Sequence, residues 1–260
     1  MSNSDVSDWW STAIIDMQPG KISLRGRPIQ DLIGQASFVE TLWLMCMGSA
    51  LSDQQRRVLE AAMVASVDHG PQAPSIAAAR MAATCGVGIN NALANGINML
   101  GDVHGGAGQQ CLELCHGIVQ RLDSGQSLTS AVEESLAEYT AQHSRFIPGF
   151  GHRFHKPVDP RSEPLLTILE ATTDSAIDRR YAQVTREIQR QLSQHKPLAI
   201  NIDGASATLY GALGVPAELA RGFFCIARGV GVLAHAWEQT QQGGRNKGPT
   251  PPHYGWTYQD

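Results

Sequence analysis

The stretch PGFGHRFHKPVDPR, residues 148–161, sets one histidine, His152, in a glycine-rich bend and an arginine, Arg161, nine positions later. Gly149 and Gly151 permit backbone conformations that a Cβ atom would forbid, so His152 can project from a tight turn. The planar guanidinium of Arg161 matches a carboxylate in shape and in hydrogen-bonding pattern. The stretch therefore predicts an anion site beside a proton-transferring group. The alternative is a solvated basic loop.

The composition is that of a globular protein with a buried core. The chain has 260 residues, of which 42% are hydrophobic and 17% are charged, and this suits one or two domains. The formal net charge of −4 favours neither nucleic acid nor an anionic membrane, so we expect small-molecule ligands, with no nucleic acid and no membrane among the partners. The N-terminal segment MSNSDVSDWW lacks the features of a signal peptide, and no unbroken apolar run is long enough to span a membrane. We therefore expect a cytoplasmic protein.

The five cysteines show no paired spacing, so no disulfide is expected. Cys46, Cys85 and Cys225 lie in apolar stretches, as core residues do. Cys111 and Cys115 lie one helical turn apart beside a histidine, but no second ligand cluster accompanies them. Packing is therefore the favoured interpretation, and no metal site is predicted.

The spacing of apolar residues predicts a mostly helical chain of the all-α class. Strand signals are concentrated in DMQPGKISLRGRPIQDL, residues 16–32, where a Pro-Gly turn joins two short alternating runs as in a small hairpin. Residues 198–202 could be extended, and the Gly/Pro-rich tail from residue 243 is predicted to be irregular chain lying on another surface. The predicted helices are 36–50, 53–67, 75–100, 107–122, 128–142, 164–170, 175–194 and 217–239.

Four further segments place polar groups in apolar or glycine-rich surroundings. His69 ends a helix within VDHGPQAPS, and His104 does so within GDVHGGAG; two such histidines are harder to assign to helix capping than one. Asp203 lies among small residues in NIDGAS, and Arg228 is an isolated cation in ARGVGVLAHAWEQ. A buried arginine is costly unless an anion meets it. Asp203 could be that anion, or it could cap a helix that begins near Ser206.

These residue types suit proton abstraction from a carbon next to a carbonyl group. Such chemistry needs a carboxylate at the carbon and a hydrogen-bond donor at the carbonyl oxygen to hold the enolate, and Asp203 and His104 fit these roles. A second histidine can exchange a proton with an oxygen of the other reactant, while arginines hold the carboxylates of that reactant bidentately. The residues therefore predict a Claisen-type or retro-Claisen step.

Together with residues 148–161, these four segments, in their order along the chain, resemble the active-site segments of the citrate synthase superfamily, from about Asp16 to the tail. The resemblance implies an all-α, citrate-synthase-like fold with a large domain of residues 1–104 and 207–260 and a small domain of residues 105–206. The site residues that it implies are the catalytic His104, His152 and Asp203; the dicarboxylate-binding His69, Arg161 and Arg228; Arg245, donated across a dimer interface; and Arg153 and Lys156 toward the phosphates of coenzyme A.

The chain departs from ordinary citrate synthases in ways that favour cleavage. It lacks their helical N-terminal region, and it resembles citryl-CoA lyase and the citrate-synthase-like module of ATP-citrate lyase. It keeps the synthase-like His104, and the position three before His69, a second histidine in some bacterial synthases, is Ser66. The resemblance implies cleavage of citryl-CoA to acetyl-CoA and oxaloacetate. The alternatives are a citrate or 2-methylcitrate synthase, and a non-catalytic protein that binds CoA esters or tricarboxylates.

The same resemblance sets expectations for cofactors and partners. No tightly bound cofactor is expected, since the coenzyme A thioester is itself substrate or product. The sequence has no phosphate-binding loop for ATP, so a lyase would depend on a separate citryl-CoA synthetase. If Arg245 acts in the partner's site, the protein is a homodimer or a tetramer of such dimers.

Overall fold

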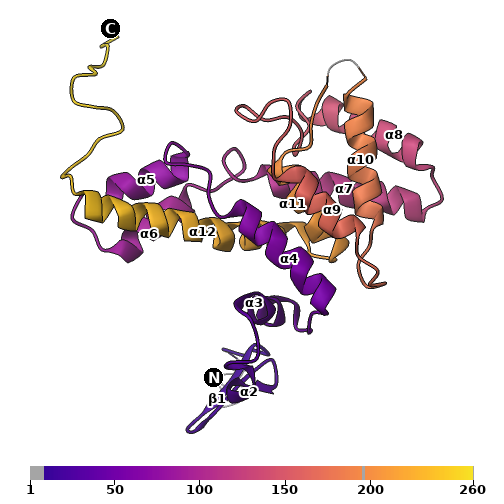
Figure 1. Ribbon diagram of the computed structural model, residues 1–260, viewed down its shortest axis with the longest axis horizontal. Helices are drawn as coiled ribbons and strands as arrows, with labels where there is room; N and C mark the ends of the chain where they lie inside the picture. Colours follow the sequence, from indigo (N-terminus) through magenta and orange to yellow (C-terminus); the bar gives the residue numbers. More distant parts are fainter. Residues whose placement is uncertain (1–8, 195–196, 260) are drawn as a thin grey trace. The chain divides into compact units, whose positions relative to one another are not determined.

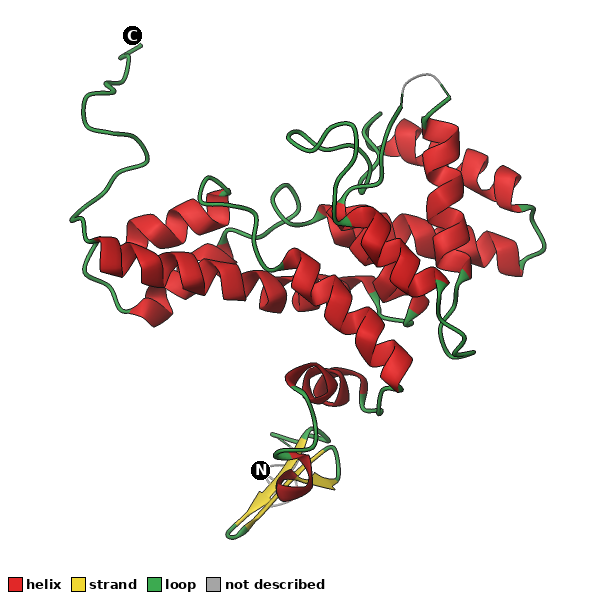
Figure 2. Cartoon of the chain, in the orientation of Figure 1, coloured by secondary structure: helices red, strands yellow, loops and turns green. Residues whose placement is uncertain are grey.

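The computed structural model describes residues 9–194 and 197–259, and most of the segment MSNSDVSDWW lies outside the described residues. The chain is mostly helical, with a small antiparallel sheet near its N terminus (Figure 1, Figure 2). Both features confirm the predicted fold class. Contacts along the chain divide it into two compact units, Met1–Glu60 and Ala61–Asp260. The predicted large and small domains, divided near residues 104 and 206, stay a prediction.

The first unit contains the sheet and two helices. The strands pair in the order β1-β2-β3, with Met17 opposite Ile22, so the predicted hairpin is confirmed and a third short strand extends it. Ser37 and Glu40 form a reciprocal capping box at the start of α3. The elements are β1 (Ile15–Gln18), β2 (Lys21–Leu24), β3 (Arg27–Pro28), α2 (Ile29–Leu32) and α3 (Phe38–Met47).

The second unit is helical and carries every predicted site residue. Helices α5, α6 and α12 pack against one another, α11 packs against α7, α9 and α10, and α12 also contacts α7. Helix α4 (Asp53–Ser66) leads into this unit. The remaining helices are α5 (Pro74–Ala83), α6 (Ile89–Asn98), α7 (Ala107–Asp123), α8 (Leu128–Gln142), α9 (Ser162–Glu170), α10 (Arg180–Leu192), α11 (Ile202–Ala212) and α12 (Ala217–Gln242).

Two sequence predictions about helices are corrected. The single helix predicted over 75–100 is two helices, because the chain turns at Gly86, whose φ of +82° is unfavourable for other residues. Helix α11 begins at Ile202 rather than near Ser206, because the Asn201 side chain caps it.

Whether a cysteine is buried depends on its position in the fold and not on the apolar character of its sequence neighbours. Cys111 and Cys115 are fully buried on α7. Cys46 and Cys85 are exposed, which corrects the prediction of core positions. Cys46 lies off the face of α3 that buries its neighbours, and Cys85 follows the end of α5.

Helix α12 has the length and apolar composition of a membrane-spanning helix. Packing accounts for part of that composition, because Phe223, Val232 and Ala236 are fully buried against neighbouring helices, whereas Val230 and Trp237 are exposed. The helix also carries Arg228, whose side chain is buried. We therefore interpret α12 as a core helix that contributes to the site.

Candidate active site

Two glycines bring the loop that carries His152 against the start of α11, which carries Asp203. A Cβ atom added to Gly149, whose φ is +86°, would lie 2.6 Å from the Cys111 sulfur and 2.7 Å from the Gly204 Cα. A Cβ on Gly204 would in turn run into the Gly149 carbonyl. The close approach of these two backbones therefore depends on the absence of side chains.

Asn201 fixes the same junction through both its backbone and its side chain. Its N–H donates to the Gly149 carbonyl (3.0 Å), and its side-chain amide donates to the Gly151 carbonyl (2.6 Å). Its side-chain oxygen accepts from the N–H groups of Asp203 and Gly204 and so caps α11. Asp203 is therefore not the cap, and its carboxyl group is left for other contacts.

Asp159 holds Arg161 from a buried position that is only 1% exposed. Its carboxylate accepts Arg161 Nε (2.9 Å) and Nη2 (2.8 Å), the Arg161 backbone N–H (3.1 Å) and the N–H of Ile202 at the start of α11 (3.1 Å). Burial alone would raise the pKa of Asp159, but the bonds from Arg161 and Ile202 lower it to about 2. Asp159 thus occupies the Nε side of the Arg161 guanidinium, and the remaining N–H groups of Nη1 and Nη2 can still donate to a ligand.

Arg228 has a guanidinium group that suits an anion. Its side chain is 4% exposed, its Nε donates to the Ser66 carbonyl (3.0 Å), and its guanidinium lies 4.9 Å from the centre of the Phe224 ring. Burial lowers its pKa, and the charges of Asp203 and Asp68 oppose that shift. No ion pair within the described chain engages Arg228, so its two Nη groups form a fork that a bound carboxylate would satisfy.

His69 faces this cationic region and is in ring contact with His152. The two ring centres are 5.5 Å apart and the rings are inclined by 69°. Burial and the charges of Arg228 and Arg161 lower the pKa of His69 to about 4. At neutral pH His69 is therefore an uncharged hydrogen-bonding group beside two arginines.

His152 presents an N–H group to the site. Its Nδ1 accepts the backbone N–H groups of Phe154 (3.1 Å) and His155 (3.0 Å), so the proton of the neutral ring lies on Nε2. Burial lowers the pKa of His152, and the neighbouring His155 acts in the same direction. To accept a proton at Nε2, the ring needs the other tautomer, and those two backbone bonds must be released.

His104 also presents an N–H group. Its Nε2 accepts the backbone N–H of Ser75 (3.2 Å) and lies 2.9 Å from the Ser75 hydroxyl, so the ring proton is on Nδ1. Burial lowers the pKa of His104, with Arg228 adding to the effect. A neutral imidazole with a free Nδ1–H is suited to hold an enolate oxygen.

Asp203 holds a proton more tightly than an ordinary aspartate. Burial raises its pKa, although the charges of Arg228 and Arg161 oppose the shift. A carboxyl group with a raised pKa beside two arginine charges can exchange a proton with carbon. The structure thus brings six predicted residues into one electrostatic neighbourhood: His69, His104, His152, Arg161, Asp203 and Arg228.

The other three predicted residues are exposed. Arg153 and Lys156 are exposed on the loop after His152. Arg245 is exposed beyond α12, where Asn246 and Lys247 donate backbone N–H groups to Thr84. Thr84 follows the C-terminal end of α5, about 13 Å along the helix axis from its start, where His104 is bound. Arg245 therefore lies away from the site of its own chain, and its role across a dimer interface stays a prediction.

Three residues that support the site were not predicted from the sequence. Asp159 stands in the Asp-Pro-Arg pattern, and its position two before Arg161 was the available signal. Asn201 stands two before Asp203, where a capping residue is common. Ser75 gave no signal, because its contact with His104 joins residues that are far apart in sequence.

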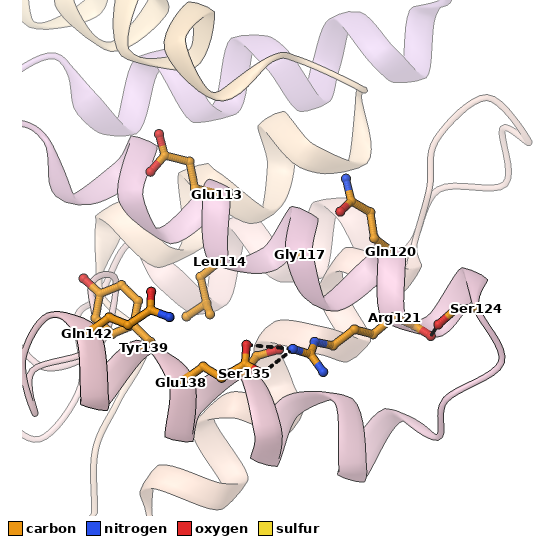
Figure 3. A pocket seen from close by; sticks show the side chains of 10 residues that line it. All are labelled: Glu113, Leu114, Gly117, Gln120, Arg121, Ser124, Ser135, Glu138, Tyr139 and Gln142. Carbon is orange, nitrogen blue, oxygen red and sulfur yellow. Dashed lines mark hydrogen bonds and ion pairs between the residues drawn. The ribbon is translucent and has the colours of Figure 1, made fainter.

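Two other features do not contribute to the site. Within the described residues, no group of three His, Cys, Asp or Glu side chains is placed to hold a metal ion. A separate hollow of about 480 Å³ lies between α7 and α8 (Figure 3), but its Arg121 is already paired with Glu138 and Glu134. That hollow offers no unpaired cation to a dicarboxylate.

The chain matches a known protein family over most of its length. The family described as "Citrate synthase, C-terminal domain" matches residues 44–247. The chain is 28% identical to "Citrate synthase" of Haloferax volcanii over 213 residues, which is 82% of this chain and 53% of that protein. It is also 28% identical to "Citrate/2-methylcitrate synthase" of Bacillus subtilis over 214 residues, 82% of this chain and 54% of that protein. The chain thus spans about half the length of these relatives.

Solved structures show the same fold. The citryl-CoA lyase from Hydrogenobacter thermophilus superposes with a TM-score of 0.82 and 30% identity, covering 97% of this chain and 95% of that chain. The ATP citrate lyase from Methanothrix soehngenii, in complex with citrate and coenzyme A, gives a TM-score of 0.81 at 17% identity, over 100% of this chain and 45% of that chain. The predicted citrate-synthase-like fold is confirmed.

Proposed function

Because the chain belongs to the citrate synthase family, we propose that it is a citryl-CoA lyase, which cleaves citryl-CoA to acetyl-CoA and oxaloacetate. The observation that carries the proposal is the position of Asp203, a half-buried carboxyl group with a raised pKa, in the same neighbourhood as His104 and Arg228. The likeness to the Hydrogenobacter citryl-CoA lyase over nearly the whole of both chains supports cleavage.

The proposed mechanism is a retro-Claisen step. Arg228, Arg161 and His69 hold the carboxylates of the oxaloacetate half, and His152, after its tautomer changes, takes the proton of the tertiary hydroxyl group. The carbon–carbon bond breaks, and the electron pair moves into an enolate that the Nδ1–H of His104 stabilises. Asp203 then donates its proton to the methylene carbon, which becomes the methyl group of acetyl-CoA. The proton on His152 returns to Asp203 through solvent, so no proton is consumed overall.

The thioester binds as substrate and leaves as product, so this scheme uses no tightly bound cofactor. Arg153 and Lys156 are exposed beside the His152 loop, where their charges suit the phosphates of coenzyme A. A lyase must also keep water from the thioester. Its citryl-CoA would come from a separate synthetase, which is a second expected partner.

A citrate or 2-methylcitrate synthase is the second candidate. The observation in its favour is that relatives matching most of this chain have these names. The same residues would run in reverse, with Asp203 abstracting the proton, and a water would then hydrolyse citryl-CoA. A protein that only binds CoA esters or tricarboxylates is disfavoured, because binding alone does not require a carboxyl group with a raised pKa in the same cationic region as neutral imidazoles.

Product analysis separates these functions. Citryl-CoA is supplied in one reaction, and oxaloacetate with acetyl-CoA or propionyl-CoA in others, while oxaloacetate and free thiol are followed. A lyase releases oxaloacetate and acetyl-CoA from citryl-CoA without free coenzyme A. Rapid release of free coenzyme A from oxaloacetate and an acyl-CoA identifies a synthase, and citrate binding without turnover identifies a binding protein.

Asp203→Asn tests the assigned chemistry. The amide keeps the shape of the side chain but cannot transfer the proton, so we expect kcat to fall about 10²–10⁴-fold while oxaloacetate still binds. Asp178→Asn, at the start of α10, is the matched control and should leave kcat unchanged. Full turnover by the Asp203 variant would show that the proton-transfer role is wrong.

We also propose a cytoplasmic homodimer, or a tetramer of dimers, in which Arg245 completes the partner's site. Mixing Arg245→Ala with Asp203→Asn subunits tests this, because a hybrid dimer would have one site with an intact Asp203 and a donated Arg245. Regained activity on mixing is the expected result. If the subunits exchange and the mixture is still as inactive as the separate variants, Arg245 does not contribute to the site of the partner subunit.

A further inference from the structure

Three consecutive residues that lead from α4 to His69 are each hydrogen-bonded to α12. The donors on α12 lie at positions 228, 231 and 235, a spacing that puts them on one face of the helix. The three bonds are Arg228 Nε to the Ser66 carbonyl (3.0 Å), Gly231 N–H to the Val67 carbonyl (3.1 Å) and His235 Nε2 to Asp68 Oδ1 (3.1 Å). The segment before His69 is thus fixed along two turns of α12.

The carboxylate of Asp68 also closes the turn that contains His69. While Oδ1 contacts His235, Oδ2 accepts the backbone N–H of Gly70 (3.2 Å). Gly70 has a φ of +84°, as the reversal of the chain requires. His69 lies between the two residues that this bond joins, so the position of the Asp68 carboxylate sets the direction of the His69 side chain.

Arg80 on α5 determines how His235 meets Asp68. Its Nη1 lies 3.2 Å from His235 Nδ1, and because a guanidinium group only donates, Nδ1 accepts and the ring proton lies on Nε2, facing Asp68. Arg80 is itself held by Glu238 (2.7 Å) and Gln242 (2.8 Å) on α12, and its side chain is only 17% exposed. The arginine therefore has little freedom to turn away from His235.

From this geometry we propose that His235 and Arg80 are positioning residues for His69. They act through Asp68, which they hold in the orientation that closes the 68–70 turn. The inference rests on the proposed function, in which His69 binds a carboxylate of the oxaloacetate half. Loss of the pair leaves the catalytic residues in place but lets the His69 ring move relative to His152 and Arg228.

Paired substitutions of His235 test the proposal. His235→Leu removes both ring nitrogens, and we expect about a tenfold rise in the dissociation constant of oxaloacetate and in the KM for citryl-CoA, with a smaller change in kcat. His235→Gln keeps an N–H for Asp68 and an oxygen for Arg80, so it should recover most of the lost affinity. A Gln variant as weak as the Leu variant would mean that the ring acts only by filling space, and would overturn the proposal.

Arg186 on α10 provides the control for Arg80. Like Arg80, it bonds two side chains of a neighbouring helix, here Glu163 (2.8 Å) and Glu170 (3.1 Å) on α9. Arg80→Gln should weaken oxaloacetate binding about as much as His235→Leu does, whereas Arg186→Gln should leave it unchanged. If both arginine variants weaken oxaloacetate binding equally, the effect is general destabilisation, and the positioning role of Arg80 is refuted.

Amide hydrogen exchange provides a measurement that needs no ligand. The Gly70 N–H is bonded to Asp68, so it should exchange faster in His235→Leu than in the wild-type protein and in His235→Gln. Unchanged exchange together with unchanged oxaloacetate affinity would overturn the positioning role. If the wild-type protein itself neither binds oxaloacetate nor turns over citryl-CoA, the proposed function fails, and the exchange at Gly70 then decides whether the pair holds the turn.

Discussion

Asp159→Asn should destabilise the protein more than a chemically identical change elsewhere in the same chain. Asp159 accepts two bonds from the Arg161 side chain and one from the Ile202 backbone, so it joins an arginine of the site to the helix that carries Asp203. An asparagine keeps one acceptor oxygen, but it turns its NH₂ group toward donors. The variant therefore loses charge-assisted bonds and gains a donor–donor contact in a buried position.

The size of the loss follows from the pKa of Asp159, which folding lowers from 3.8 to about 2. At 1.36 kcal/mol per unit, this shift corresponds to about 2 kcal/mol of stabilisation by the ionised form. Removing one partner of a buried pair costs about 3–5 kcal/mol, and partial exposure of Arg161 reduces that value. We therefore expect the free energy of unfolding to fall by about 2–4 kcal/mol.

Acid should remove the same stabilisation from the wild-type protein. Because the pKa of Asp159 is lower in the folded state, its contribution is complete above about pH 3.8 and disappears as the pH falls toward 2. Asp159→Asn should lose this component of the acid sensitivity. The difference between the two proteins isolates Asp159 from the other carboxylates.

Asp178 is the matched control. It also lies two residues before an arginine, Arg180, and accepts its backbone N–H, Nε and Nη2, but its side chain is 33% exposed. A surface pair of this kind contributes less than about 1 kcal/mol. Urea unfolding of both variants gives the comparison, and KM for citryl-CoA should rise only for Asp159→Asn. Equal losses of unfolding free energy for the two variants would refute the reasoning.

Three further changes give distinct outcomes. His69 takes up a proton near pH 6.5 in the unfolded chain and near pH 4 in the folded protein. The free energy of unfolding should therefore fall by about 1–2 kcal/mol, after allowance for solvent exposure, as the pH drops through this range. Urea unfolding should show a smaller fall for His69→Gln. Gly204→Ala should lose about 1–3 kcal/mol in thermal unfolding because the new methyl group meets the Gly149 carbonyl, whereas Gly117→Ala, where a Cβ meets nothing, should gain about 0.5–1 kcal/mol. Arg228→Lys loses the fork and should bind oxaloacetate about 10–100-fold more weakly by calorimetry; wild-type affinity would contradict an anion-binding role.

The residues that the sequence identified share a property that needs no three-dimensional information. Each is an ionisable or strongly hydrogen-bonding side chain that lies among glycines or apolar residues, as His104 does in GDVHGGAG and Asp203 does in NIDGAS. Helical periodicity likewise predicted most of the helices, because each buries an apolar face. The hairpin was predictable from its Pro-Gly turn.

The features that were missed depend on contacts or turns that a one-dimensional pattern does not record. Apolar spacing continues across the turn at Gly86, so two helices resemble one. The tautomer of His104 is set by Ser75, which is distant in sequence, and Asp159 occupies the Nε side of the Arg161 guanidinium, which leaves its Nη1 side for a ligand. Such tertiary bonds decide which nitrogen of a predicted residue is available for chemistry.

Two sets of contacts hold the residues of the site in place, and few residues belong to both sets. Helix α12 holds the segment before His69, and α5, which packs on α12, holds His104 through Ser75. The contact between Gly149 and Gly204 holds the loop of His152 against the helix of Asp203. The two sets meet where the His69 ring touches His152 and where the charge of Arg228 reaches Asp203. In the proposed reaction, citryl-CoA contacts both sets, so the binding energy of its carboxylates can hold its thioester carbon beside Asp203, which is how binding remote from the reacting atoms contributes to catalysis.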